Sequence, residues 1–222
     1  MSYDFFLILF SYICGSIPFG LLISYVFKKN DPRNIGSKNI GATNVLRTGG
    51  LKLGLMTLIL DILKGFIAIK ITLILNANLV GLSIIFVVIG HIFPIWLKFK
   101  GGKGVATFIG VLLGYNFQLF LLFCITWLVC ALIFKYSSLS AIIALVINAL
   151  STIAIDSNYV YFVIISFLIL IKHSSNIQRL LAGNETKIIL KKKIKFIFYK
   201  NLVVFYYKCL MASPLKKINF GH

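Results

Sequence analysis

The chain has 222 residues, of which 59% are hydrophobic and only 13% are charged. Soluble domains carry about 25% charged residues, so this composition excludes a soluble globular fold. The formal net charge of +18 would indicate a nucleic-acid partner in a soluble protein. In so apolar a chain it indicates membrane topology instead, and we expect no nucleic acid. The expected fold is an all-α, polytopic integral membrane protein.

Seven apolar segments follow one another along the chain and predict seven transmembrane helices. The first segment precedes the basic residues, which is the reverse of a secretory signal, so we expect it to be retained. We divide the stretch 105–134 at Gly114-Tyr115-Asn116, because a single helix of that length would exceed the hydrocarbon thickness by about a third. The predicted spans are 4–27, 53–75, 79–97, 105–115, 117–134, 138–155 and 158–172.

The lysine and arginine residues support this topology and give it a direction. All 23 of them except Lys64 and Lys70 fall in segments on one side, and the loops on the other side have none. Because basic loops stay in the cytoplasm, we expect the N-terminus outside and the C-terminus cytoplasmic, in a bacterial inner membrane. The chain then consists of a seven-helix domain, 1–190, and a basic, aromatic cytoplasmic tail, 191–222, which either lies on the membrane surface or is partly disordered.

Two glycine-rich segments on the predicted cytoplasmic side are candidate anion sites. The first, 36–47, reads GSKNIGATNVLR and offers small residues, polar side chains and one guanidinium. An ordinary glycine-rich connector explains this composition slightly better when it is taken alone. The second, 90–106, reads GHIFPIWLKFKGGKGVA and ends where a helix is expected to begin. A helix N-terminus with nearby glycines and Lys103 can bind an anion, although its lysines could also be topological anchors only.

The third polar segment, 173–185, reads HSSNIQRLLAGNE and follows the last predicted span. At 3.6 residues per turn, His173 and Asn176 share one helical face. His173 could be an acid, a base or an interfacial cap. Glu185 is the only acidic residue after the last predicted span, and we expect it to pair with basic groups nearby.

Ionisable residues and cysteines also lie in the apolar segments. Asp61 and Lys64 are three residues apart, so they can reach each other along a helix face, either as a structural pair or as part of a transport pathway.

The cysteines show no CxxC spacing, and we expect neither disulfides nor a metal site. They are Cys14, Cys124, Cys130 and Cys209.

Taken together, the three segments resemble the signature motifs of the bacterial acyl-phosphate:glycerol-3-phosphate acyltransferases, the PlsY family. GSIPFG at 15–20 and DILKG at 61–65 extend the resemblance, which covers about residues 4–190. It implies a seven-helix enzyme that transfers an acyl group from acyl phosphate to the 1-hydroxyl of glycerol 3-phosphate. It also implies no cofactor, a membrane-lipid environment and a functional link to an enzyme that produces acyl phosphate. The family pattern has glycine at the position of Lys38.

The resemblance assigns roles by position in these motifs. The catalytic residues would be Ser37, Arg47, Lys103, His173 and Asn176. The substrate-binding residues would be Asn39, Gly41, Thr43, Asn44, Gly101, Gly102 and Gly104, and the structural residues Asp61, Lys64 and Glu185. We further expect Arg47 and Lys103 to hold one phosphate from two sides at the start of the fourth span, with a hydrogen bond from Ser37.

Acyl phosphate is an activated anhydride, so such an enzyme can act by positioning and charge neutralisation without a strong protein nucleophile. The sequence contains no GxSxG elbow and no cysteine paired with histidine in the predicted cytoplasmic loops. Two other classes stay open. A transporter for an anionic solute would use the intramembrane Asp61 and Lys64, and a scaffold would recruit partners through the basic tail.

Overall fold

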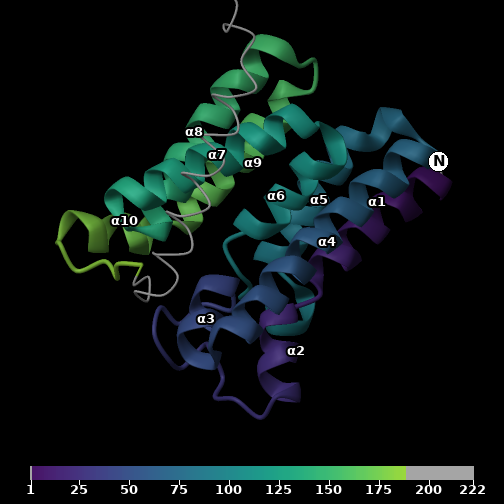
Figure 1. The fold of residues 1–222 in the computed structure, drawn as a ribbon. Helices are drawn as coiled ribbons and strands as arrows, with labels where there is room; N and C mark the ends of the chain where they lie inside the picture. Colours follow the sequence, from purple (N-terminus) through teal and green to yellow (C-terminus); the bar gives the residue numbers. More distant parts are fainter. Residues whose placement is uncertain (1, 189–222) are drawn as a thin grey trace, which may run out of the picture. The chain divides into compact units, whose positions relative to one another are not determined.

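The computed structural model describes residues 2–188, and every regular element in that range is helical. The predicted tail, 191–222, lies outside the described residues. Figure 1 shows the helices in two groups, one built from α1, α4, α5 and α6 and the other from α7, α8 and α9. Contacts of α5 with α9 and of α6 with α7 join the groups.

The first group begins with a bent pair of helices. Helix α1 (Ser2–Ser16) and helix α2 (Phe19–Val26) meet at an angle of 43°. Pro18 lies at the break, and its ring removes a backbone N–H and prevents a continuous helix. The predicted span 4–27 therefore consists of two helix segments with a bend between them. Helix α3 (Ala42–Gly49) then leads into α4 (Leu51–Leu75).

Helix α5 (Val80–Ile92) and helix α6 (Val105–Tyr115) complete the first group, with single 3₁₀ turns at Ala77–Leu79 and Ile95–Leu97. Glycines allow α4 and α6 to cross closely. A Cβ atom on Gly65 would lie 2.2 Å from the Thr107 oxygen, and one on Gly110 would lie 1.9 Å from the Ile62 oxygen. Small residues at such a crossing are typical of membrane helix packing. This crossing places the DILKG segment beside the start of α6.

The second group contains α7 (Phe117–Phe134), α8 (Ser137–Ile155), α9 (Tyr159–Lys172) and α10 (Ser174–Leu181). The predicted division of the 105–134 stretch is confirmed. Asn116 separates α6 from α7, and its side chain accepts hydrogen bonds from the N–H groups of Gln118 and Leu119. An N-cap of this kind stabilises a new helix start.

The helices indicate a multi-pass membrane protein. Three stretches are long and apolar enough to cross a membrane: Ala77–Leu97, Phe117–Phe134 and Ser137–Ile155. The bent pairs α1–α2 and α9–α10 raise the number to five if each is one span. Helix α4 is 25 residues long but carries several charged side chains, and α6 has only 11 residues.

Candidate active site

The three polar segments of the sequence meet in the structure. From α3, Arg47 donates a hydrogen bond through Nη2 to the Thr186 carbonyl, at 3.3 Å. From the loop before α6, Lys103 donates through Nζ to the Asn176 Oδ1 atom on α10. Segments more than a hundred residues apart in the chain therefore share one site, as expected for loops that enclose a ligand.

Asn44 holds the first polar segment in shape. Its side chain is buried, with 1% of its surface exposed. The Nδ2 group donates to the carbonyls of Pro32, Ile35 and Asn39, at 2.7, 3.0 and 2.8 Å. The Oδ1 atom accepts the Ser37 N–H at 2.9 Å. Since its polar atoms bond to residues 32–39, Asn44 positions this loop, and the substrate-binding role that the resemblance implies for it stays a prediction.

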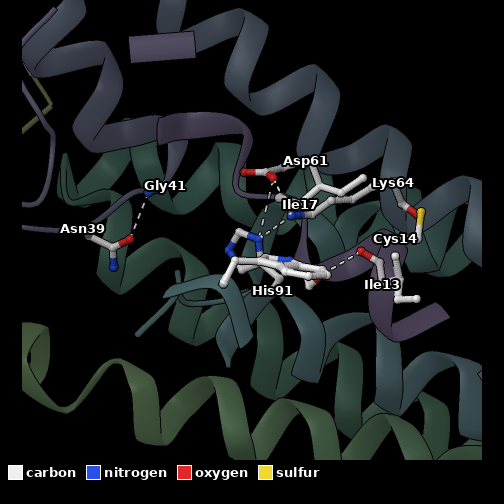
Figure 2. A network of polar contacts seen from close by, with 10 residues as sticks. Ile13, Cys14, Ile17, Asn39, Gly41, Asp61, Lys64 and His91 are labelled. Atoms are coloured by element: carbon white, nitrogen blue, oxygen red, sulfur yellow. Dashed lines mark hydrogen bonds and ion pairs between the residues drawn. The ribbon is translucent and has the colours of Figure 1, made fainter. Parts of the chain in front are cut away.

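The same loop ends in a second local turn. The Asn39 Oδ1 atom accepts the Gly41 N–H at 2.9 Å, immediately before α3 begins, and Figure 2 shows this pair. Thr43, in the first turn of α3, faces Ser137 at the start of α8, with their hydroxyl oxygens 3.5 Å apart. Asn39 and Gly41 thus shape the entry into α3.

Lys38 has a backbone φ of +54°, in the left-handed region that favours glycine. This conformation explains physically why glycine suits this position in the family pattern. A lysine there carries some backbone strain, but it retains the turn and adds a charge to the loop.

The glycine-rich loop before α6 folds back onto the end of α5. Gly101 and Gly102 donate their N–H groups to the carbonyls of Ile92 and His91, each at 3.0 Å. Gly104 is the N-cap of α6, with a φ of +94° and no side-chain cap. The first N–H groups of α6 have no partner within the helix, so this terminus presents donors and a partial positive charge.

Lys103 is partly buried beside other cations. Burial, followed by the nearby charge of Arg179, lowers the pKa of Lys103 to about 8, and Arg47 acts in the same direction while Glu185 opposes it. Lys103, Arg179 and Arg47 therefore form a group of three cationic side chains with one carboxylate, Glu185. An excess of positive charge at a helix N-terminus suits an anionic ligand.

Glu185 connects the third polar segment. Its Oε1 atom accepts hydrogen bonds from Asn176 at 2.9 Å and Ser138 at 3.1 Å, and its Oε2 atom accepts one from Arg179 at 2.8 Å. Burial raises the pKa of this carboxyl, but the hydrogen bonds from Arg179 and Asn176 outweigh it and hold the pKa below its usual range. The predicted pairing of Glu185 with a basic group is present, with Arg179 as the partner.

His173 lies at the bend between α9 and α10. The two helices meet at 55°, and His173 is the N-cap residue of α10, the helix that carries Asn176. The His173 N–H bonds to the Leu170 carbonyl, a tighter turn that ends α9. The His173 Nδ1 atom lies 2.8 Å from the Ile169 carbonyl. A carbonyl only accepts, so Nδ1 carries the proton and Nε2 has a lone pair.

A second charged cluster lies in the interior. The Lys64 Nζ atom is 2.8 Å from Asp61 Oδ1, 2.8 Å from the Ile17 carbonyl and 2.9 Å from His91 Nδ1. Figure 2 shows these side chains converging, with Cys14 nearby. The predicted contact between Asp61 and Lys64 is confirmed, but His91 was missed. Its signal in the sequence was an ionisable residue inside the predicted span 79–97, which is a costly position for such a group.

The cysteines are the remaining reactive groups, and the Cys14 thiol donates a hydrogen bond to the Lys64 carbonyl at 3.3 Å. Cys14, Cys124 and Cys130 are unpaired thiols on helices, and Cys209 lies outside the described residues. Within residues 2–188, no group of three or more His, Cys, Asp or Glu side chains could hold a metal ion. The joint hold of Arg47, Lys103 and Ser37 on one phosphate stays a prediction.

Comparisons with known proteins bear on this site. The family model described as glycerol-3-phosphate acyltransferase matches residues 5–183. A glycerol-3-phosphate acyltransferase of Francisella tularensis subsp. holarctica (strain OSU18) is 47% identical over 196 residues, which cover 86% of this chain and 96% of the relative. The protein of the same name from Francisella philomiragia subsp. philomiragia is 45% identical over the same shares.

Two crystal structures of PlsY (YgiH), an integral membrane glycerol 3-phosphate acyltransferase, have a similar fold. The glycerol 3-phosphate form has a TM-score of 0.81 and 37% identity, over 84% of this chain and 96% of that chain. The lysophosphatidic acid form has a TM-score of 0.78 and 35% identity, over 83% and 95%. All three polar segments lie within the matched residues of the family model, apart from the last two residues of the third.

Proposed function

Since this chain belongs to the PlsY family of glycerol-3-phosphate acyltransferases, we propose that its acyl donor is acyl phosphate. The acyl carbon forms an ester bond with the 1-hydroxyl oxygen of sn-glycerol 3-phosphate, and the bond from that carbon to the phosphate oxygen breaks. The hydroxyl proton is taken up by the departing phosphate, so the products are 1-acyl-glycerol 3-phosphate and inorganic phosphate. An enzyme that makes acyl phosphate must supply the donor.

The observation that carries this proposal is the excess of positive charge at the start of α6. The charges of Arg179 and Arg47 act on Lys103, and Glu185 is the only carboxylate among the described residues whose charge acts on it in the opposite direction. Both substrates of the proposed reaction carry a phosphate group. Pre-arranged cations and helix N–H groups stabilise such charges without reorganising during the reaction.

Each residue of the site then has a task. Arg47 and Lys103 bind phosphate, assisted by the Ser37 hydroxyl, and the glycines of the GGKG loop let the anion approach the backbone. His173 is held with Nε2 unprotonated, so it can accept a hydrogen bond from the attacking hydroxyl. Asn176 aligns Lys103, and Glu185 fixes Asn176 and Arg179.

Direct transfer fits the groups available. An acyl phosphate needs no further activation, and positioning alone supplies a large part of the rate. The thiols of Cys14, Cys124 and Cys130 lie on helices, with Cys14 donating its hydrogen bond to the Lys64 carbonyl at 3.3 Å. An acyl-enzyme intermediate is therefore not part of the proposed mechanism.

Seven membrane spans complete the proposal, with the N-terminus outside and the site at the cytoplasmic side of the inner membrane. Helix α4 counts as a span because its 25 residues reach about 37 Å and because Asp61 and Lys64 neutralise each other in the interior. Helix α6 counts as a short span. The family assignment favours an enzyme over the transporter interpretation of the buried pair.

The experiment supplies purified, folded protein with palmitoyl phosphate and glycerol 3-phosphate, without ATP, metal ions or coenzyme A. We expect lysophosphatidic acid and inorganic phosphate in equal amounts. A parallel reaction contains palmitoyl-coenzyme A in place of palmitoyl phosphate and should give no product. Turnover with the thioester alone would overturn the proposed donor, while leaving the family assignment intact.

A further inference from the structure

His91 connects the buried charge pair to the glycine-rich loop. It is the penultimate residue of α5, and only 5% of its surface is exposed. One side of its imidazole faces Lys64, whose Nζ atom lies 2.9 Å from Nδ1. The other side faces Gly102, whose N–H also bonds to the His91 carbonyl at 3.0 Å. The residue therefore touches both networks.

Lys64 determines the protonation of this imidazole. A lysine ammonium has three N–H donors and no acceptor, so the His91 Nδ1 atom must present its lone pair to Nζ. Asp61 holds Lys64 from a second direction and Ile17 from a third. The imidazole is then neutral with its proton on Nε2, and it is fixed in orientation by a charge-assisted hydrogen bond.

The fixed imidazole in turn supports Gly102. A Cβ atom on Gly102 would lie 2.1 Å from the Nε2 atom of His91, 2.9 Å from Cε1 and 3.0 Å from Cδ2. A Cβ atom on Gly101 would meet backbone oxygens instead, at 2.2 Å from His91 and 2.8 Å from Ile92. Gly102 thus packs directly on the ring, and Lys103 follows it in the chain.

We propose that His91 is a positioning residue of this acyltransferase: anchored by Lys64 and Asp61, it holds Gly101 and Gly102 so that Lys103 reaches the phosphate site. This inference rests on the proposed function only in assigning a phosphate to Lys103. These contacts connect the buried Asp61–Lys64 pair to the start of α6 through the His91 imidazole. The DILKG segment and His91 would therefore both position the GGKG loop.

The test uses a steric rescue in the full-length protein. Gly102→Ala should lower kcat/KM by ~10- to 100-fold, mainly through KM, because a misplacement of about 1 Å has an effect of this order. His91→Asn removes the ring atoms nearest the new methyl group but keeps an acceptor close to the Nδ1 position. The double variant, His91→Asn with Gly102→Ala, should therefore recover most of the activity that Gly102→Ala loses.

Gly101→Ala is the matched control. Its methyl group would meet the backbone, so His91→Asn should not rescue it. His91→Leu is the second control, because it retains bulk but offers Lys64 no acceptor, and it should raise KM more than His91→Asn does. Equal rescue of both glycine variants, or no rescue of either, would overturn the proposal.

Hydrogen exchange of segment 99–104 provides a measurement that does not need turnover. We expect faster exchange in Gly102→Ala and His91→Leu, and exchange close to the parent in the rescued double variant. If Gly102→Ala does not fold, recovery of folded protein in the double variant replaces the kinetic comparison. Unchanged exchange in His91→Leu would refute the positioning role. A parent that fails to use palmitoyl phosphate but shows this exchange pattern would refute only the proposed donor.

Discussion

Two charged networks lie within reach of each other in this protein and are built differently. The interior cluster contains one carboxylate and one ammonium, Asp61 and Lys64, with a neutral His91, and its side chains are 2 to 5% exposed. The cluster at the start of α6 gathers Lys103, Arg47 and Arg179 around Glu185, and the Arg179 side chain is 35% exposed. The two charges of the interior cluster cancel each other. The cluster at the start of α6 has more positive than negative charge, so positive charge is left for a ligand.

The largest expected effect comes from unbalancing the interior cluster. Lys64→Met leaves Asp61 buried without its cation, which should destabilise the fold by about 3–5 kcal/mol. Asp61→Asn combined with Lys64→Met removes both charges and should restore most of that loss. Thermal unfolding in detergent measures the difference. If Lys64→Met is as stable as the parent, the Asp61 carboxylate does not need a cationic partner in the interior.

The second prediction concerns the cations of the unbalanced cluster. Lys103→Ala or Arg47→Ala should lower kcat/KM at least tenfold, since a hydrogen bond to a charged group contributes about 1.5–3 kcal/mol. Stability should change little, because the ion-pair partner of Glu185 is Arg179, which both variants retain. Arg47→Lys should recover only part of the activity, since an ammonium cannot bind two phosphate oxygens as a planar guanidinium does. Parental kinetics for both substrates in both alanine variants would make these cations topological anchors only.

The third prediction is a pH dependence that arises from Lys103. With a pKa of about 8, Lys103 is charged at neutral pH and loses its proton as the pH rises through that value. Phosphate binding needs the charged form, so kcat/KM should fall by about tenfold per pH unit well above pH 8. Lys103→Arg keeps its charge throughout and should remove this fall, even if its activity at pH 7 is lower. If kcat/KM of Lys103→Arg falls with pH as it does in the parent, a group other than Lys103 causes the fall.

The smallest effect is expected from replacing the cysteines, because the proposed mechanism uses none of them as a nucleophile. Replacing Cys14, Cys124, Cys130 and Cys209 together should leave most activity, because direct transfer needs no acyl-enzyme. Serine suits position 14, where the thiol donates to the Lys64 carbonyl. An acylated protein trapped after incubation with the donor alone would contradict direct transfer, and mass spectrometry of the intact chain detects it.

Local patterns in the sequence predicted much of this molecule. The helix break at Asn116 follows from length and from a residue type that caps helices, and the contact between Asp61 and Lys64 follows from helical spacing. Glu185 found its partner six residues away, at Arg179. Helix geometry brings Asp61 and Lys64 together, whereas Glu185 follows the end of α10 and reaches Arg179 from the segment after that helix.

Long-range contacts could not be predicted in this way. His91 and Lys64 are 27 residues apart and meet only because α4 and α5 pack together. The bonds from the Asn44 amide to the loop around it were not predicted either, since they depend on how the loop folds over this buried side chain. The bend at Pro18 was visible as a residue type, yet the apolar segment around it predicted a continuous span.

The shortness of α6 has a consequence for where the chemistry takes place. Its 11 residues reach only about 16 Å, roughly half of a 30 Å hydrocarbon layer. The 18 residues of α7 reach about 27 Å, so in the proposed topology α7 crosses fully and Asn116 lies at the outer boundary. The start of α6 then lies below the cytoplasmic boundary of the hydrocarbon layer. A lipid-borne donor could deliver its reactive carbonyl there sideways, without lifting its chain out of the bilayer.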